Sequence, residues 1–166
     1  MWTGCKLWGD IWRRVSSGLV GREAFNLVYL LAHDRLGTRE RGYRLMPAKY
    51  KSDLCDNCKK ETETVVHRYA TCEWVASLWA YMADLLRKLD KEFEQLNLDT
   101  ILGFHFRKGK RDGAVTWLLS NYLVFVNQEM VVKGRKPQLC ELVGMLRYAR
   151  TKLESQATKD VGVIHL

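Results

Sequence analysis

The sequence predicts a mainly α-helical protein, and three observations lead to this prediction. Apolar residues recur at intervals of three and four over several long segments, which is the period of an amphipathic helix. The 166 residues include only two prolines, Pro47 and Pro137, so helices are seldom interrupted. No segment shows the sustained apolar-polar alternation of a half-buried strand. With 47% hydrophobic residues, the chain can also bury a core.

The first predicted helices precede the cysteine-rich passage. One long helix places an apolar stripe on one face, formed by Ala24, Leu27, Val28 and Leu31. We expect it to end near Leu36, with Gly37 as a left-handed cap. Thr38 is a suitable N-cap for a short helix through Arg44, and a connector at residues 47–53 follows.

Three further helices are expected in the rest of the chain. The second long helix begins after Cys72, and its stripe consists of Val75, Leu78, Trp79, Met82, Leu85, Leu86 and Leu89. The third runs through residues 117–126 and is apolar on most sides, which favours a central position. The fourth follows Pro137, and its stripe consists of Leu139, Leu142, Val143, Leu146, Ala149 and Leu153.

These elements suggest a division of the chain at a basic, glycine-bearing segment. Residues 1–95 are expected to form a basic helical segment plus a metal-binding module, and residues 96–112 a hinge. Residues 113–157 are expected to form a helical C-terminal part, arranged as a hairpin, and residues 158–166 a loose tail.

In one segment, CDNCKKETETVVHRYATC at residues 55–72, the spacing of cysteine and histidine residues indicates metal binding. Its pattern is C-x2-C-x8-H-x4-C, formed by Cys55, Cys58, His67 and Cys72. A CxxC turn can aim two sulfurs at one point, and the other two ligands can meet them from the start of a helix. Four protein ligands complete a tetrahedron without an open position, so we predict one structural Zn²⁺ ion.

Two other interpretations of these cysteines stay open. A CxxC sequence can be a redox or disulfide pair, and buried cysteines can be unconnected to a metal. A redox pair usually opens a helix in a βαβ unit, whereas residues 59–64 form a polar loop without a preceding strand pattern. Zinc is therefore the favoured interpretation. Cys5 and Cys140 lie far from the cluster in sequence and are interpreted as small hydrophobic residues.

The chain is basic, with a formal net charge of +8 and a pI near 9.3. Through residue 51 there are ten basic and four acidic residues. Such a surface favours a polyanionic partner, and we predict RNA and/or DNA. Cations can follow the phosphate backbone, and tyrosines can stack on unpaired bases. The candidate contact residues are Arg35, Arg39, Arg41, Tyr43, Arg44, Lys49 and Lys51 before the metal loop, and Arg107, Lys108, Lys110 and Arg111 in the hinge.

These basic residues also admit less specific interpretations. Arginines on a short surface helix are often simply solvated, and the hinge run can be a nuclear-import patch or a solvated loop. We expect an intracellular, nuclear, monomeric protein, because the start of the chain lacks a secretory signal pattern and reduced thiols suit zinc. No membrane partner is expected, since the most apolar stretch, residues 114–126, is shorter than the about 20 residues that span a bilayer.

The order of these motifs resembles the zinc-binding region that follows the polymerase in non-LTR (LINE-type) retrotransposon reverse transcriptases. The matching segments lie within about residues 8–90 and are GDIWRRV, FNLVYLLAHDRLGTRERGYRL, CDNC, ETETVVHRYATC and VASLWAYM. The positions that correspond to the family pattern are Trp12, His33 to Thr38, Cys55, Cys58, Glu63 to His67, Cys72 and Trp79. The Cys58–His67 spacer varies within the family, and Ala32 stands where leucine is common.

The resemblance implies an accessory module that holds template RNA or target DNA beside a polymerase domain, with the four ligands on zinc. We expect no enzymatic activity, because the chain lacks the adjacent aspartates of a polymerase turn. It also lacks the carboxylate sets expected of RNase H and endonuclease sites. Two alternatives are a zinc-stabilised helical domain that binds protein and a retroelement relic without independent function.

Overall fold

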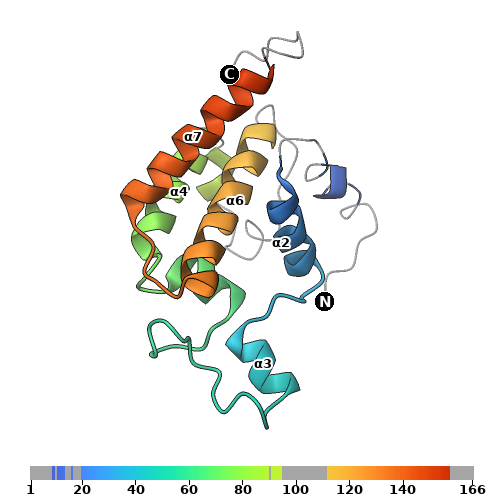
Figure 1. Ribbon diagram of the computed structural model, residues 1–166, viewed down its shortest axis with the longest axis vertical. Coiled ribbons are helices and arrows are strands. Elements are labelled where there is room, and N and C mark those ends of the chain that lie inside the picture. Colours follow the sequence, from blue (N-terminus) through green and yellow to red (C-terminus); the bar gives the residue numbers. More distant parts are fainter. Residues whose placement is uncertain are drawn as a thin grey trace.

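The computed structural model describes residues 9, 11–13, 16, 20–89, 91–94 and 112–157, and this part of the chain is mainly helical (Figure 1). Within it there is no β-strand, and an isolated antiparallel bridge pairs Leu54 with Thr62. The predicted fold class, mainly α, is confirmed. No helix within the described ranges is long and apolar enough to cross a membrane.

The positions of the predicted helices are also confirmed, with small differences at their ends. In chain order the elements are α2 (Arg22–Ala32), α3 (Arg39–Leu45), the π-helix η1 (His67–Thr71), α4 (Ala76–Leu89), the 3₁₀-helix η2 (Lys91–Glu94), α6 (Asp112–Val126), the π-helix η3 (Asn127–Val132) and α7 (Leu139–Ala157). The predicted tail, and most of the predicted hinge, lie outside the described residues.

Helix α6 lies at the centre of the helical part and packs against α2, α4 and α7 (Figure 1). Its apolar side chains that are no more than 2% exposed are Val115, Leu119, Tyr122, Leu123 and Val126. The stripe on α4 contributes Leu78, Met82 and Leu86 to the same core. This core draws on both sides of the predicted hinge, and the division into domains stays a prediction.

The end of α2 differs from the expectation. The helix ends at Ala32 rather than near Leu36, and Asp34, not Gly37, takes the left-handed conformation, with φ 48°. The Asp34 N–H donates to the Leu31 C=O at 3.0 Å, and the Arg35 N–H donates to the Leu30 C=O at 2.7 Å. These two bonds form a Schellman cap. The prediction of a Gly37 cap is therefore wrong, and aspartate takes the role because it tolerates this conformation better than most residues.

Helix α3 begins as predicted and lies at one end of the molecule beside the metal loop (Figure 1). Thr38 Oγ1 accepts the Arg41 N–H at 3.3 Å, which confirms the N-cap. Gly42 faces the ring of Tyr50, and a Cβ atom at Gly42 would lie 3.0 Å from ring carbons. Any larger residue at Gly42 would therefore have to displace the Tyr50 ring by a few tenths of an ångström.

Candidate metal centre

Four buried side chains converge on one point. The ligand atoms of Cys55, Cys58, His67 and Cys72 all lie within 4.8 Å of one another, and none of these residues is more than 8% exposed. The Cys58 Sγ lies 3.3 Å from the His67 Nε2. In a tetrahedral site with sulfur and nitrogen ligands, neighbouring ligand atoms are roughly 3.5–3.8 Å apart. The predicted ligands are thus brought together in an arrangement that can hold a metal ion.

Backbone N–H groups surround the three sulfurs. The donors are Asn57 and Cys58 toward Cys55, Lys60 and Glu61 toward Cys58, and Trp74 toward Cys72. Such bonds are possible because the turn after Cys55 is tight: the Lys59 N–H donates to the Cys55 C=O at 2.9 Å, and Lys59 has φ 59°. N–H groups aimed at sulfur favour the thiolate over the thiol. These bonds therefore offset part of the cost of burying a thiolate, and they do so most fully at Cys58.

The three thiols differ in how readily they ionise. Burial raises the pKa of Cys58, but the backbone N–H bonds outweigh burial and bring its pKa to about 7. Burial and the neighbouring Cys55 and Cys58 sulfurs raise the pKa of Cys72 to about 12, and burial also raises the pKa of Cys55. Three thiolates in this space would repel one another, so all three ionise together only where a bound cation offsets their charge.

The π-helix η1 explains the four-residue spacing between His67 and Cys72. In an α-helix, residues five apart point about 140° away from each other. Here the Cys72 N–H donates to the His67 C=O at 2.8 Å, which closes a turn with one extra residue. The wider turn lets both ligands face the same point. Thr64 starts this turn, because its Oγ1 accepts the His67 N–H at 3.0 Å.

The imidazole of His67 is oriented by the carboxylate of Glu61. Its Nδ1 lies 3.0 Å from Glu61 Oε2 and 3.5 Å from Thr71 Oγ1, while Nε2 faces the cysteines. A proton on Nδ1, donated to Glu61, leaves the Nε2 lone pair for a metal. Sequence reasoning missed Glu61. The loop contains several acidic residues, and the sequence alone does not indicate which of them reaches the imidazole.

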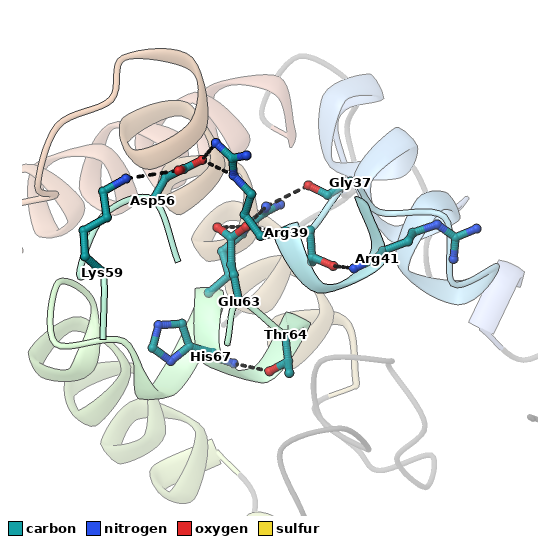
Figure 2. A network of polar contacts seen from close by, with 10 residues as sticks. Gly37, Arg39, Arg41, Asp56, Lys59, Glu63, Thr64 and His67 are labelled. Atoms are coloured by element: carbon teal, nitrogen blue, oxygen red, sulfur yellow. Dashed lines mark hydrogen bonds and ion pairs between the residues drawn. The ribbon is translucent and has the colours of Figure 1, made fainter. Parts of the chain in front are cut away.

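A buried ion pair links the metal loop to α3. Arg68 donates from Nε to Glu63 Oε1 at 3.1 Å and from Nη2 to Oε2 at 2.9 Å. The same Nη2 donates to the Gly37 C=O at 2.8 Å, and Glu63 Oε2 accepts the Arg39 N–H at 2.8 Å. Figure 2 shows the Glu63 carboxylate and the Gly37 carbonyl in this network, with the Arg39 side chain beside them. Burial alone would lower the pKa of Arg68, but Glu63 outweighs it and the pKa is raised, so the guanidinium stays charged.

Several of the predicted nucleic-acid contacts are engaged within the molecule. Arg39 pairs with Asp56, next to the first ligand, and Asp56 also accepts from Lys59 at 3.1 Å (Figure 2). Arg41 and Arg44 lie 3.0 Å and 3.7 Å from Asp34. The remaining candidates before the loop are exposed, and within the described ranges no ion pair engages them: Arg35, Lys49 and Lys51. Tyr43 is 45% exposed. The predicted hinge contacts Arg107, Lys108, Lys110 and Arg111 lie outside the described residues.

Comparisons with protein-family models, curated proteins and solved structures give no match to this chain. The resemblance to non-LTR reverse transcriptases thus depends on the order of the sequence motifs.

Proposed function

We propose that the four-ligand cluster binds one Zn²⁺ ion in a structural role. Three thiolates and one imidazole are the soft and borderline ligands that zinc prefers, and tetrahedral geometry suits their spacing. The carboxylate of Glu61 behind His67 is the usual outer partner of a zinc-bound imidazole. Four protein ligands leave no position for substrate, so the ion organises the surrounding segment and takes no part in a reaction.

The organised segment, in this proposal, binds single-stranded RNA or DNA. The observation that carries the proposal is the connection between the metal cluster and the basic stretch. Asp56 lies inside the CxxC turn and pairs with Arg39, and Arg68 follows His67 and binds the Gly37 C=O. Both contacts fix the start of α3, on either side of which Arg35, Lys49 and Lys51 are exposed. Three cations on a fixed frame suit a phosphate backbone.

The order of the sequence motifs extends this proposal to the larger protein from which the chain would derive. The chain would be the zinc-binding region of a non-LTR reverse transcriptase, would hold RNA or target DNA close to a polymerase domain, and would work in the nucleus. The net charge of +8 supports a polyanionic partner. The polymerase domain would then be a second, protein partner.

A second candidate function is protein binding by the end of α3. Tyr43, Leu45 and Met46 are 45%, 57% and 47% exposed, which is unusual for large apolar residues that are neighbours in sequence. A protein partner that covers them would bind with little dependence on salt. Nucleic-acid binding, in contrast, weakens steeply as salt increases.

The metal part of the proposal is tested by the zinc content of the purified protein. We expect stoichiometric zinc, lost in Cys58→Ser and retained in Cys140→Ser, which removes an exposed cysteine outside the cluster. Absence of zinc from protein purified without chelator and refolded with the metal would contradict the proposal.

The nucleic-acid part is tested by the salt dependence of binding to single-stranded oligonucleotides. Replacing Arg35, Lys49 and Lys51 by glutamine should weaken binding and lower the slope of log K against log salt by about 2, since each phosphate contact contributes about 0.7 on a single strand. The control replaces Arg87, Arg147 and Lys152, which are exposed on α4 and α7, and removes the same charge. Equal effects of both triple variants would mean that net charge alone drives binding. Salt-independent binding of protein, without oligonucleotide binding, would favour the second candidate.

A further inference from the structure

A small cavity lies beside the metal loop. Its volume is about 230 Å³, below the roughly 300–1,000 Å³ of sites for drug-sized ligands, so it suits one ring system. Its walls come from the start of α3, the connector, the CxxC turn and the two π-helices. The lining residues are Gly37, Thr38, Arg39, Tyr50, Asp56, Asn57, Glu63, Arg68, Met130 and Val131.

The charges in this cavity cancel. Arg68 is paired with Glu63, both side chains being 5% exposed, and Arg39 is paired with Asp56. Each guanidinium has its carboxylate within hydrogen-bonding reach, so the walls offer neither a free cation to a phosphate nor a free anion to an amine. A fully charged ligand would lose its hydration without gaining a partner. The cavity therefore favours an uncharged, polar ligand.

Two kinds of group remain to recognise such a ligand. Asn57 carries an amide that has no hydrogen-bond partner within the described ranges, and an amide offers both donors and an acceptor. Tyr50 supplies an aromatic side chain, whose ring packs against Gly42 and whose ring centroid lies 5.4 Å from the Arg39 guanidinium and 5.5 Å from the Lys49 ammonium. Met130 and Val131 supply an apolar wall from η3. Apolar surfaces with an amide at the edge match a flat heterocycle whose rim carries donors and acceptors.

The two edges of the cavity carry cations that the cavity itself lacks. Lys49 and Lys51 adjoin the lining residue Tyr50 in sequence. The lining residue Val131 is followed closely by the loop at residues 133–136, with the sequence KGRK. Lys133 and Arg135 pair with Glu129, whereas Lys136 is exposed and has no ion-pair partner within the described ranges. A neutral cavity between cationic edges resembles the charge distribution of a nucleotide, in which a neutral base is joined to anionic phosphates.

We propose that this cavity receives one unstacked nucleobase of a single-stranded nucleic acid, with Asn57 reading its edge and the Lys49–Lys51 and Lys133–Lys136 segments holding the adjoining phosphates. The inference rests on the proposed function, because it specifies how the single strand is bound. It adds the 133–136 loop, which lies far along the chain from the metal site, to the binding surface.

Gly37 offers a substitution that adds bulk to the lining of the cavity without a clash. A Cβ atom at Gly37 would have no heavy atom within 4 Å, and the residue has no positive φ, so valine is tolerated there. Gly37→Val adds a branched side chain at a lining residue whose carbonyl accepts from Arg68. Gly144→Val on α7 is the matched control, because its Cβ would also project into open space, away from the cavity.

The direct test titrates the zinc-loaded protein with free adenosine, guanosine, cytidine and uridine and follows the side-chain amide signals of Asn57 and the methyl signals of Val131 by NMR. Saturable shifts with at least one nucleoside are expected in the parent chain and in Gly144→Val. Gly37→Val should weaken the affinity about 5- to 150-fold, the range for loss of one stacked base, and Asn57→Ala should change the preference among nucleosides. Absence of saturable shifts in the parent chain would overturn the inference.

A second measurement separates failure of this inference from failure of the proposed function. Single-stranded oligonucleotides with and without abasic positions are bound to the same variants over a series of salt concentrations. If the cavity holds a base, Gly37→Val weakens binding of the intact strand, leaves the salt slope unchanged and has no effect on the abasic strand. Salt-dependent binding that Gly37→Val does not alter would overturn the cavity inference and leave the proposed function standing. Failure of the parent chain to bind any strand would overturn both.

Discussion

Two regions of this molecule are held together by different forces. Between residues 37 and 66, the buried positions are Thr38, Gly42, Cys55, Cys58 and Glu63, and none of them is an aliphatic or aromatic side chain. The helical region around α6 instead buries a continuous set of leucine, valine, methionine and tyrosine side chains. A segment without its own apolar core depends on ion pairs, and a metal ion bound to the four-residue cluster would take the place that a core takes elsewhere.

The two regions meet at η1. Tyr69 and Tyr122 are both 0% exposed, and the Tyr122 hydroxyl donates to the Tyr69 C=O at 2.5 Å, which joins η1 to α6. The neighbouring residues on η1, His67 and Arg68, serve the metal loop and α3. One short turn therefore contacts both regions, and the following predictions test how independent they are.

The largest effect is expected from removal of the metal. Structural zinc contributes on the order of 10–16 kcal/mol in small zinc domains, so a strong chelator or Cys72→Ser should abolish amide-exchange protection in residues 38–66. Protection in α6 and in most of α4 should persist, because their core is apolar. Hydrogen exchange followed by mass spectrometry measures both regions at once, with Cys140→Ser as control. Uniform loss of protection would mean that the chain unfolds as one unit.

Arg68→Met should cost about 3–5 kcal/mol of unfolding free energy in the zinc-loaded protein, because it leaves the Glu63 carboxylate buried without its partner. Denaturant unfolding measures the loss. The double variant Glu63→Gln, Arg68→Met also removes the unpaired buried carboxylate, so it should recover part of the lost unfolding free energy. Arg150→Met, which breaks an exposed pair with Glu154, is the control and should have little effect.

Leu123→Ala tests the apolar helical region around α6. The side chain is 0% exposed on the central helix, so the substitution should cost about 2–5 kcal/mol through lost burial and a residual cavity. Zinc stoichiometry should remain that of the parent chain. Denaturant unfolding combined with metal analysis checks both statements, and loss of zinc from the folded variant would contradict the separation of the two regions.

Glu61→Gln should lower zinc affinity about 10- to 100-fold, because the imidazole of His67 loses the carboxylate that orients it. Competition with a chromophoric chelator measures the affinity. Glu73→Gln, which removes the partner of Lys60 without touching His67, should leave the affinity close to that of the parent. Equal effects of the two variants would assign the loss to net charge.

The smallest effect is expected at Lys59. Glycine there relieves the left-handed backbone at φ 59°, and after the entropy that glycine loses on folding we expect a gain of about 0.5–1 kcal/mol. Lys60→Gly, next along the turn but without a positive φ, should destabilise the zinc-bound loop. Thermal unfolding in excess zinc distinguishes the two, and a loss in Lys59→Gly would show that its contact with Asp56 matters more than the backbone strain.

The convergence of the four candidate ligands and the positions of the helices could be predicted from the sequence because both depend on local spacing. The four ligands fall within residues 55–72, and the apolar stripes repeat within each helix. The cap at Asp34 could not be predicted, since Asp34 and Gly37 both tolerate the left-handed conformation and nothing local selects between them.

The ion pairs made by the basic residues also could not be predicted from the sequence. Arg41 meets Asp34, and Arg39 meets Asp56, only because the chain folds back between α2 and the CxxC turn. A count of charges along the sequence does not reveal which of them face each other. The cavity depends on a still longer separation, because Met130 meets residues 37–68 through the packing of α6.

The extra residue in η1 also sets the rotational phase of α4. Cys72 belongs to the buried cluster of candidate ligands, and its carbonyl accepts the first hydrogen bonds of the turn that leads into α4, from Val75 and Ala76 at 2.9 Å each. Deleting one residue from 68–71 would rotate Cys72 and α4 by about 100° about the helix axis relative to His67. Either Cys72 would leave the ligand cluster, or Leu78 and Met82 would turn away from the core. The number of residues between His67 and Cys72 therefore determines the rotation of α4 about its own axis. We expect this segment to tolerate substitutions more readily than insertions or deletions.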